Sequence, residues 1–266
     1  DLFFDEVSHD RDLIVKSDYA KEIAKNIADN TNSHFIELDA LNKIYRVVMP
    51  DKLNYFDISG MLDDDLPKDI HRRDLTINAM VYDINAEKFI DENQLPFEDF
   101  NNKILRTFDL QNFIDDPLRM LRVYRFAAKY DFSIDEKITD FIKNNCKLIN
   151  NPAKERVNTE IMKLFEGEYS HTALLKMDET GLLTEIFPVM NEVKTIPPNT
   201  HHHLDLFHHL IETVNQIEKN CKNLEDISKK SFDSMELGNF SRKAFLKLAG
   251  LLHDIGKPDT WTIDED

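Results

Sequence analysis

The fold is decided by the stretch Asp10-Arg11-Asp12-Leu13-Ile14-Val15, which sets two acidic residues at the start of an apolar run. Side chains alternate between the faces of a strand, so Asp10 and Asp12 would project to one side, opposite Leu13. Two ionised carboxylates held side by side repel each other unless a cation lies between them. Hard oxygen ligands suit Mg²⁺, which binds substrate phosphates in two-metal phosphoryl transfer. The sequence therefore predicts a two-metal site on a strand, the alternative being an ordinary solvated strand end.

A second polar motif, Arg72-Arg73-Asp74-Leu75-Thr76-Ile77-Asn78-Ala79, combines two arginines with an aspartate and an asparagine. Arginine guanidinium groups match phosphate oxygens bidentately. The amide of Asn78 can hydrogen-bond a ribose hydroxyl, and Asp74 can orient an arginine rather than contact a substrate. The motif favours phosphate binding by Arg72 and Arg73 over the alternative, a charge cluster at a helix terminus.

The run that begins at Pro117 has the pattern of a helix. A proline in the first helical turn, preceded by two acidic residues, is a strong start signal. Asp116 and Arg119 are three residues apart and can lie on neighbouring turns of one face. Arg122 and Arg125 continue that row at the same spacing. The alternative is a surface salt bridge beside a solvated basic stripe.

Four ordered motifs carry a resemblance to a known family. Residues 72–79 match RRDxxxNA, and Asp115-Asp116-Pro117-Leu118-Arg119-Met120-Leu121-Arg122-Val123-Tyr124-Arg125-Phe126 looks like EDxxR with its RxxRF continuation. Glu155-Arg156-Val157 with Glu160 resembles a later ER-containing helix motif, and Asp1-Leu2-Phe3-Phe4 looks like the end of a glycine-containing segment. Over essentially its whole length, the sequence resembles the class II tRNA nucleotidyltransferase and bacterial poly(A) polymerase superfamily.

The resemblance implies a nucleotidyltransferase in which an RNA 3′-hydroxyl attacks the α-phosphate of a nucleoside triphosphate. Asp10 and Asp12 would then be catalytic and hold two Mg²⁺ ions, with the tRNA 3′ end, CTP and ATP as substrates. Asp116 and Arg119 would read the Watson–Crick edge of the base, since CTP and ATP both present an amino group beside an acceptor. The other nucleotide-binding residues that the resemblance implies are Arg72, Arg73, Asp74, Asn78, Arg122 and Arg125. Asp115 stands where the family more usually has Glu.

Two further segments bear on specificity. Bacterial poly(A) polymerases usually carry a G-R/K-R-F segment, and the comparable strand here, Asn42-Lys43-Ile44-Tyr45-Arg46-Val47-Val48, lacks it. The resemblance therefore favours tRNA end-building. The segment Ile58-Ser59-Gly60-Met61-Leu62-Asp63-Asp64-Asp65-Leu66 is compact and acidic, as in some CC-adding and some CCA-adding relatives. We expect a CCA-adding enzyme, with a CC-adding (or A-adding) specialist as the open alternative.

The last third of the chain carries a second candidate site. His253-Asp254-Ile255-Gly256-Lys257 resembles the His-Asp dyad of HD-domain phosphohydrolases, and His209 would supply another ligand. Neutral imidazole plus carboxylate suits a transition metal at His209, His253 and Asp254. A complete HD site normally needs a further Asp downstream. The triple His201-His202-His203 is internal and indicates a solvated loop. An HD phosphohydrolase with a nucleotide-binding front domain is thus a rival of another class, and a partner-binding remnant of a longer enzyme is a third option.

Composition and charge narrow the setting. The 266 residues are 41% hydrophobic, enough for a sizeable core and more than one domain. No apolar run approaches 18 residues and no signal-peptide pattern is present, so we expect a cytoplasmic protein without a membrane partner. Cys146 and Cys221 are far apart and fit a reducing compartment. A net charge of −17 has the wrong sign for general RNA binding, so tRNA contacts would need local basic patches. The sequence gives no indication of an oligomeric state.

The hydrophobic pattern predicts an α+β fold: a mixed-sheet head, polymerase β-like by the resemblance, then an all-helical neck and body with an HD-like region. The predicted domains are 1–107 (head), 108–168 (neck) and 169–266 (body). The predicted strands are 12–16, 34–38, 43–49, 54–58, 79–84 and 103–108. The predicted helices are 19–31, 65–73, 117–130, 136–149, 154–166, 170–180, 205–219 and 241–253, with 221–240 as a loop or frayed helix.

Overall fold

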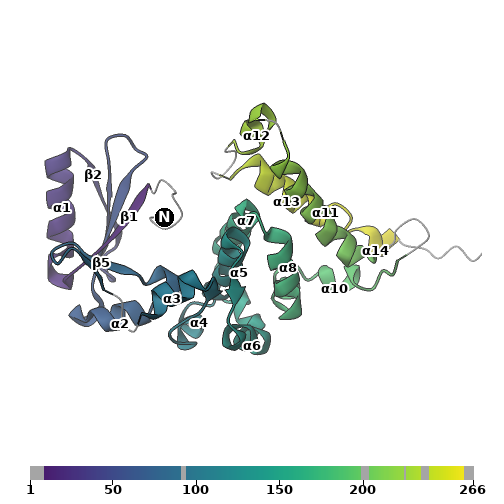
Figure 1. The fold of residues 1–266 in the computed structure, drawn as a ribbon, viewed down its shortest axis with the longest axis horizontal. Helices are drawn as coiled ribbons and strands as arrows, with labels where there is room; N and C mark the ends of the chain where they lie inside the picture. Colours follow the sequence, from purple (N-terminus) through teal and green to yellow (C-terminus); the bar gives the residue numbers. More distant parts are fainter. Residues whose placement is uncertain (1–8, 91–93, 199–203, 225, 235–239, 261–266) are drawn as a thin grey trace, which may run out of the picture. The chain divides into compact units, whose positions relative to one another are not determined.

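A computed structural model describes residues 9–90, 94–198, 204–224, 226–234 and 240–260 (Figure 1). The chain forms two compact units, residues 1–72 and 73–266. The predicted domain limits at 107 and 168 remain predictions. Two sequence features lie outside the described residues: the segment 1–4 and the histidines 201–203.

The first unit is built on a four-stranded mixed sheet. Its strand order is β1 (Asp10–Val15), β4 (Tyr55–Gly60), β3 (Ile44–Val48) and β2 (His34–Asp39). The pair β1 and β4 is parallel, and the other two pairs are antiparallel. All four strands were predicted within two residues of their limits, because each is a short run of apolar and β-branched residues between turn residues.

Helix α1 (Ala20–Thr31) covers one face of this sheet (Figure 1). The helix buries three alanines at spacings of four residues, so its backbone approaches the strands closely: Ala20, Ala24 and Ala28. Opposite them lie Tyr45, Val47 and Ile58. Leu13 also packs against this core, so its neighbour Asp12 belongs to the other face of the sheet.

The end of the first unit corrects one prediction. The helix expected at 65–73 is α2 (Leu66–His71), which begins after its N-cap Asp65 and ends before both arginines. Arg72 is the C-cap residue, and Arg73 already belongs to the second unit. The prediction was wrong because charge pattern alone does not mark a helix end.

The second unit opens with small elements and continues as helices. The opening elements are β5 (Val81–Asp83), β6 (Lys88–Ile90), α3 (Leu95–Asn101), β7 (Ile104–Leu105), α4 (Gln111–Asp115) and β8 (Ser133–Ile134). The strands predicted at 79–84 and 103–108 shorten to β5 and β7. Helices α3 and α4 were not predicted, because both are too short for a repeating apolar pattern to stand out and neither has a side-chain cap.

The longer helices follow the prediction closely. They are α5 (Leu118–Tyr130), α6 (Glu136–Asn145), α7 (Lys154–Glu166), α8 (Ser170–Glu179), α11 (Leu206–Lys222) and α13 (Arg242–Leu252). Short helices complete the unit: α9 (Leu182–Ile186), α10 (Met190–Val193), α12 (Asp226–Phe232) and α14 (Lys257–Thr260). Among the described residues, no helix has the length and apolarity that a membrane crossing requires.

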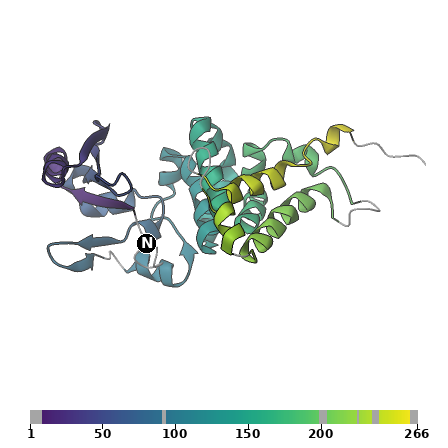
Figure 2. The same cartoon turned by 90° about the horizontal axis from the view of Figure 1, so that it is seen from above.

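Two helix pairs position the candidate sites of the second unit. α5 packs against α7 and α8, and α11 runs beside α13 (Figures 1 and 2). The buried face of α5 includes Leu118, Leu121 and Tyr124. Phe126 is only partly buried and stacks on Tyr130.

Candidate functional site

The strand residues Asp10 and Asp12 lie on β1 beside β4. Asp10 is in register with Tyr55, and Asp12 with Asp57. In a parallel pair, residues in register face the same side, so Asp57 lies on the same face of the sheet as Asp12. This face, opposite α1, is called the open face below. Asp12 is exposed. The open face therefore carries carboxylates on two adjacent strands.

An ion pair on the same open face of the sheet holds Asp57. Arg46 is in register with Asp57 on the next strand, and its Nε and one terminal nitrogen each lie 2.7 Å from a carboxylate oxygen. The guanidinium also lies 4.1 Å from the centre of the Tyr55 ring. Sequence reasoning missed this arginine, because the pairing depends on strand register.

The Arg72 side chain pairs with a residue of α2, the helix that ends just before it. The buried carboxylate of Asp69 lies 3.0 Å from Nε of Arg72 and 2.7 Å from a terminal nitrogen. The Asp69 side chain is 1% exposed, whereas that of Arg72 is 48% exposed. The guanidinium is thus anchored on one edge and accessible to solvent.

Asp74 is the centre of the candidate site in the second unit. Its carboxylate accepts hydrogen bonds from Arg122 Nε at 2.6 Å and from the Asn78 amide at 3.0 Å. The backbone N–H of Leu75 donates a third at 2.9 Å. Burial would raise the pKa of the Asp74 carboxyl, but the Arg122 charge and these hydrogen bonds outweigh it and hold the pKa below its usual range. The RRD motif and helix α5 are therefore joined by an ionised, buried pair.

Asn112 links the same two motifs and was not predicted. Its side-chain amide nitrogen donates to the Arg73 backbone carbonyl at 3.0 Å, and its backbone carbonyl accepts from the Arg119 side chain at 3.3 Å. Asn112 is buried on α4. No sequence pattern singled it out, because a single asparagine in a short helix carries no periodic signal.

Asp116 and Arg119 occupy the turn into α5. Asp116 lies between α4 and α5, so the two residues are not on successive turns of one helix as expected. One Asp116 oxygen accepts the Leu118 N–H at 3.3 Å, and the other lies 2.9 Å from Arg156 on α7. The ER-containing motif thus contacts the EDxxR motif, although sequence reasoning gave Arg156 no role.

The side chain of Arg125, also on α5, is more buried than that of Arg122. Its Nε is 3.3 Å from the buried Glu160 on α7, and its guanidinium lies 4.3 Å from the centre of the Phe126 ring. Only 16% of the Arg125 side chain is exposed.

The contacts of Asp74, Asn112 and Asp116 join a set of residues around α5. We call this set the neck cluster: Arg73, Asp74, Asn78, Asn112, Asp116, Arg119, Arg122 and Arg156.

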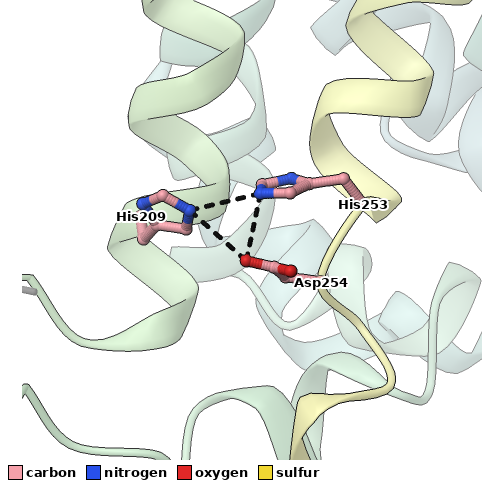
Figure 3. Close-up of side chains that lie close together, drawn as sticks. All are labelled: His209, His253 and Asp254. Atoms are coloured by element: carbon pink, nitrogen blue, oxygen red, sulfur yellow. Dashed lines mark hydrogen bonds and ion pairs between the residues drawn. The ribbon is translucent and has the colours of Figure 1, made fainter.

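The HD-like residues converge in the same unit. His209 lies on α11, and His253 and Asp254 follow α13; Figure 3 shows the three side chains pointing toward one another. Nε2 of His209 lies 3.2 Å from Nε2 of His253 and 3.5 Å from an Asp254 oxygen, which is 3.1 Å from His253. We call these three residues the HD cluster.

The donor atoms of the HD cluster suit a transition metal. Ligands about 2.1 Å from one ion in tetrahedral or octahedral geometry lie about 3.0 to 3.4 Å apart, close to the observed separations. Nδ1 of His253 lies 2.8 Å from the Gly250 carbonyl. A carbonyl can only accept, so Nδ1 carries the proton and Nε2 is left with its lone pair toward the cluster. His208, the neighbour of His209, instead pairs with the N-cap Asp205 at 2.7 Å.

A buried charge pair fixes the helices that carry the HD cluster. Lys247 on α13 lies 3.1 Å from Glu218 on α11, and both side chains are almost fully buried. Glu218 also accepts the N–H of Ser170 at 2.7 Å and pairs with His171 at 2.5 Å. Helices α8, α11 and α13 are thus tied together by one hydrogen-bonded network.

Comparison with known proteins identifies the family of this chain. The family model described as poly A polymerase head domain matches residues 37–106, and the one described as probable RNA and SrmB-binding site of polymerase A matches residues 131–194. The chain belongs to the tRNA nucleotidyltransferase and poly(A) polymerase superfamily. The predicted resemblance is confirmed. The HD-like part of the chain lies outside both matches.

Relatives in this superfamily bear four kinds of name. The tRNA nucleotidyltransferase cca1 of Schizosaccharomyces pombe is 31% identical over 62% of this chain and 34% of its own length. A CC-adding tRNA nucleotidyltransferase of Synechocystis is 32% identical over 68% of this chain and 43% of its own. Others are named A-adding and CCA-adding enzymes. The chain thus spans less than half the length of these first two relatives.

A solved structure supports the predicted fold class. A tRNA nucleotidyltransferase complexed with a primer tRNA and an incoming ATP analog matches with a TM-score of 0.72 at 20% identity. The match covers 95% of this chain and 69% of that one. The predicted α+β architecture, a sheet head followed by helices, is therefore confirmed.

Proposed function

We propose that this chain is a template-independent tRNA nucleotidyltransferase that adds C and A residues to the tRNA 3′ end from CTP and ATP. The neck cluster carries the proposal. There Arg122 joins the RRD motif at Asp74, and Arg156 joins the EDxxR motif at Asp116. Carboxylates beside guanidinium groups offer the donors and acceptors that a base edge and a triphosphate need. The names of the relatives agree with this activity.

The proposed reaction joins an RNA 3′-oxygen to the α-phosphorus of the nucleotide. The bond from that phosphorus to the bridging β-phosphate oxygen breaks, and pyrophosphate leaves. Asp10 and Asp12 would hold two Mg²⁺ ions, which when bound lower the pKa of the hydroxyl and stabilise the pyrophosphate. Asp12 fits this role because it is an exposed carboxylate on the same sheet face as Asp57.

Base selection falls to Asp116 and Arg119 in this proposal. The Asp116 carboxylate would accept from the exocyclic amino group of cytosine or adenine, and Arg119 would donate to the neighbouring acceptor. The Asp116 carboxylate lies 2.9 Å from Arg156, and an ionised carboxylate can only accept hydrogen bonds. Uracil and guanine present an acceptor where cytosine and adenine present the amino group, so UTP and GTP would be rejected.

The triphosphate would be bound by Arg72, Arg73 and Arg122, with Arg125 behind them and Asn78 on the ribose. Asp74 would act through Arg122 and Asn78, since it contacts both. CCA addition is our first assignment, and a CC-adding or A-adding specialist is the alternative. The compact segment 58–66 keeps this alternative open, because a short turn follows β4 directly.

One assay tests the activity and its specificity together. The protein is incubated with Mg²⁺ at low salt and a tRNA lacking its last three nucleotides, with labelled CTP, ATP or both. Two C followed by A indicates a CCA-adding enzyme, and CC alone with both nucleotides present indicates the specialist. Asp12→Ala should abolish incorporation while leaving the circular dichroism spectrum unchanged. Normal turnover by this variant would reject the two-metal proposal.

A metal-dependent phosphohydrolase at the HD cluster is the second candidate function. The convergence of three donor atoms and the orientation of His253 by Gly250 favour it. A transition metal bound by His209, His253 and Asp254 would supply an activated water for attack on a phosphoester. The ion is detected independently of turnover by measuring the metal content of the purified protein. A wild-type protein that binds no Zn²⁺, Mn²⁺, Ni²⁺ or Co²⁺ would reject this candidate.

We also propose a reducing, cytoplasmic setting. Cys146 and Cys221 are both free thiols in the structure, as expected for such a compartment. Fractionation of the source cells, followed by immunodetection, tests this location.

A further inference from the structure

Asp69 is a buried acidic residue to which the proposed reaction gives no role. It lies on α2 with a side chain 1% exposed, and one oxygen, Oδ1, accepts both donors of the Arg72 edge. A buried carboxylate costs free energy unless a cation compensates it. Arg72 is that cation, yet nearly half of its side chain faces solvent.

The same carboxylate oxygen also holds the turn between β4 and α2. The N–H of Leu62 donates to Oδ1 of Asp69 at 3.3 Å. The turn is fixed at other points as well, because Met61 donates to the Val15 carbonyl at 2.7 Å and Ser17 donates to Asp64 at 2.6 Å. Val15 is the last residue of the strand that carries the Asp10 and Asp12 pair. A continuous set of hydrogen bonds therefore runs from the end of β1, through this turn and Asp69, to Arg72.

We propose that Asp69 is a positioning residue: its carboxylate fixes the Arg72 guanidinium relative to the β1 strand, so that Arg72 is preorganised to bind the triphosphate of the incoming nucleotide. The inference rests on the proposed function, which assigns Arg72 to the triphosphate. An arginine side chain has several rotatable bonds, and a fixed guanidinium loses less freedom when phosphate binds. The nucleotide affinity, rather than the chemical step, should therefore depend on Asp69.

The test is a double-mutant cycle on nucleotide incorporation by the full chain. Asp69→Asn keeps an acceptor for the Leu62 N–H but removes the charge that orients Arg72. We expect the KM for both CTP and ATP to rise about tenfold, with kcat changed less than twofold. Arg72→Gln should raise KM at least as much. The double variant should match Arg72→Gln alone, because Asp69 acts only through that arginine.

A matched control comes from the same turn. Asp63 also pairs with a cation, Lys68 at 3.2 Å, but its side chain is 64% exposed, unlike that of Asp69. Asp63→Asn should leave both KM values unchanged. If Asp69→Asn does not fold, Asp69→Glu keeps the charge and displaces the carboxylate by one methylene, and it should raise KM several-fold.

The outcomes separate the two proposals. An active wild type with unchanged KM in Asp69→Asn or Asp69→Glu would overturn the role of Asp69 alone. Independent, multiplying effects of Asp69→Asn and Arg72→Gln would also overturn it. A wild type that neither incorporates nucleotides nor binds CTP would overturn the proposed function and this inference with it. A KM that rises in Asp69→Asn, and does not rise further when Asp69→Asn is added to Arg72→Gln, would support both.

Discussion

The neck cluster and the HD cluster are held together in opposite ways. In the neck cluster, a carboxylate with 8% of its side chain exposed is surrounded by a guanidinium and an amide. In the HD cluster, two imidazoles and a carboxylate meet with 21% to 38% of each side chain exposed. Opposite charges fix the first arrangement without any ligand, whereas the three donor atoms of the second need a shared proton or cation between them. A carboxylate that is already paired with a cation is held in place by the protein itself, whereas donor atoms that face one another leave room for a shared proton or cation.

The largest effect should follow from removing the centre of the neck cluster. Asp74→Ala leaves Arg122 without its carboxylate and Asn78 without its acceptor. We expect a loss of about 3 kcal/mol of unfolding free energy, as for a broken, mostly buried pair. Nucleotide incorporation should fall by about two orders of magnitude, since about 3 kcal/mol of lost positioning corresponds to that factor.

Urea denaturation and the incorporation assay measure both effects. Asp140→Ala, at an exposed position on α6, is the control and should cost less than about 0.5 kcal/mol. An Asp74→Ala protein as stable and active as the control would remove the basis for calling the neck cluster preorganised.

The next effect concerns the HD cluster. His253→Ala should abolish stoichiometric transition-metal binding, because it removes one of three donors, and should leave nucleotide incorporation within about twofold of wild type. Metal content by mass spectrometry and the incorporation assay provide the measurements. His208→Ala is the matched control, since His208 pairs with Asp205 outside the cluster. Full metal retention in His253→Ala would mean that the three residues do not form a site.

A smaller effect is expected in the pH dependence of stability. The pKa of Asp74 is lowered in the folded protein, so its pairing stabilises the fold fully above the ordinary Asp value of 3.8 and is lost as the pH falls through the lowered value. The stability difference between wild type and Asp74→Asn should therefore be constant from pH 5 to 7 and shrink below about pH 4. Denaturation series at stepped pH measure it. A difference that grows with acidity would contradict the assigned pairing.

The smallest effect should come from a cation beside the HD cluster. Nζ of Lys257 lies 2.6 Å from the Asp254 oxygen that faces His253. Because it competes with a metal for that oxygen, Lys257→Met should tighten metal binding a few-fold, as measured by competition with a chelator. Lys219→Met, at an exposed position on α11, should leave the affinity unchanged. Weaker binding in Lys257→Met would mean that the lysine orients Asp254 for the metal.

Local chemistry made several elements predictable. Helix α5 follows from Pro117 and the apolar spacing after it, and β1 follows from a short β-branched run. The three residues of the HD cluster were also predicted from motif resemblance alone. The structure brings them together although His209 and His253 are 44 positions apart. These features were predictable because the residues that signal each of them lie close together in the sequence or form a recognisable motif.

Other features depend on which elements pack together. α3 begins after Gln94 in a left-handed conformation without a side-chain cap, so no start signal precedes it. Arg46 reaches Asp57 only through the register of β3 and β4. Asn112 contacts Arg73 across 39 positions. None of these contacts leaves a periodic trace in the sequence.

The sequence by itself determined the family, the α+β order of elements and the residue types of both clusters, because strand alternation, helix caps and motif strings are local properties. Only the tertiary structure decided the partners: Asp74 with Arg122, Asp116 with Arg156, and Asp69 with Arg72. The first two pairs join residues 40 or more positions apart. The third joins near neighbours, but it requires the end of α2 and the burial of one carboxylate. Charge type is encoded in the sequence, whereas the distance and burial that decide which charges meet arise from packing.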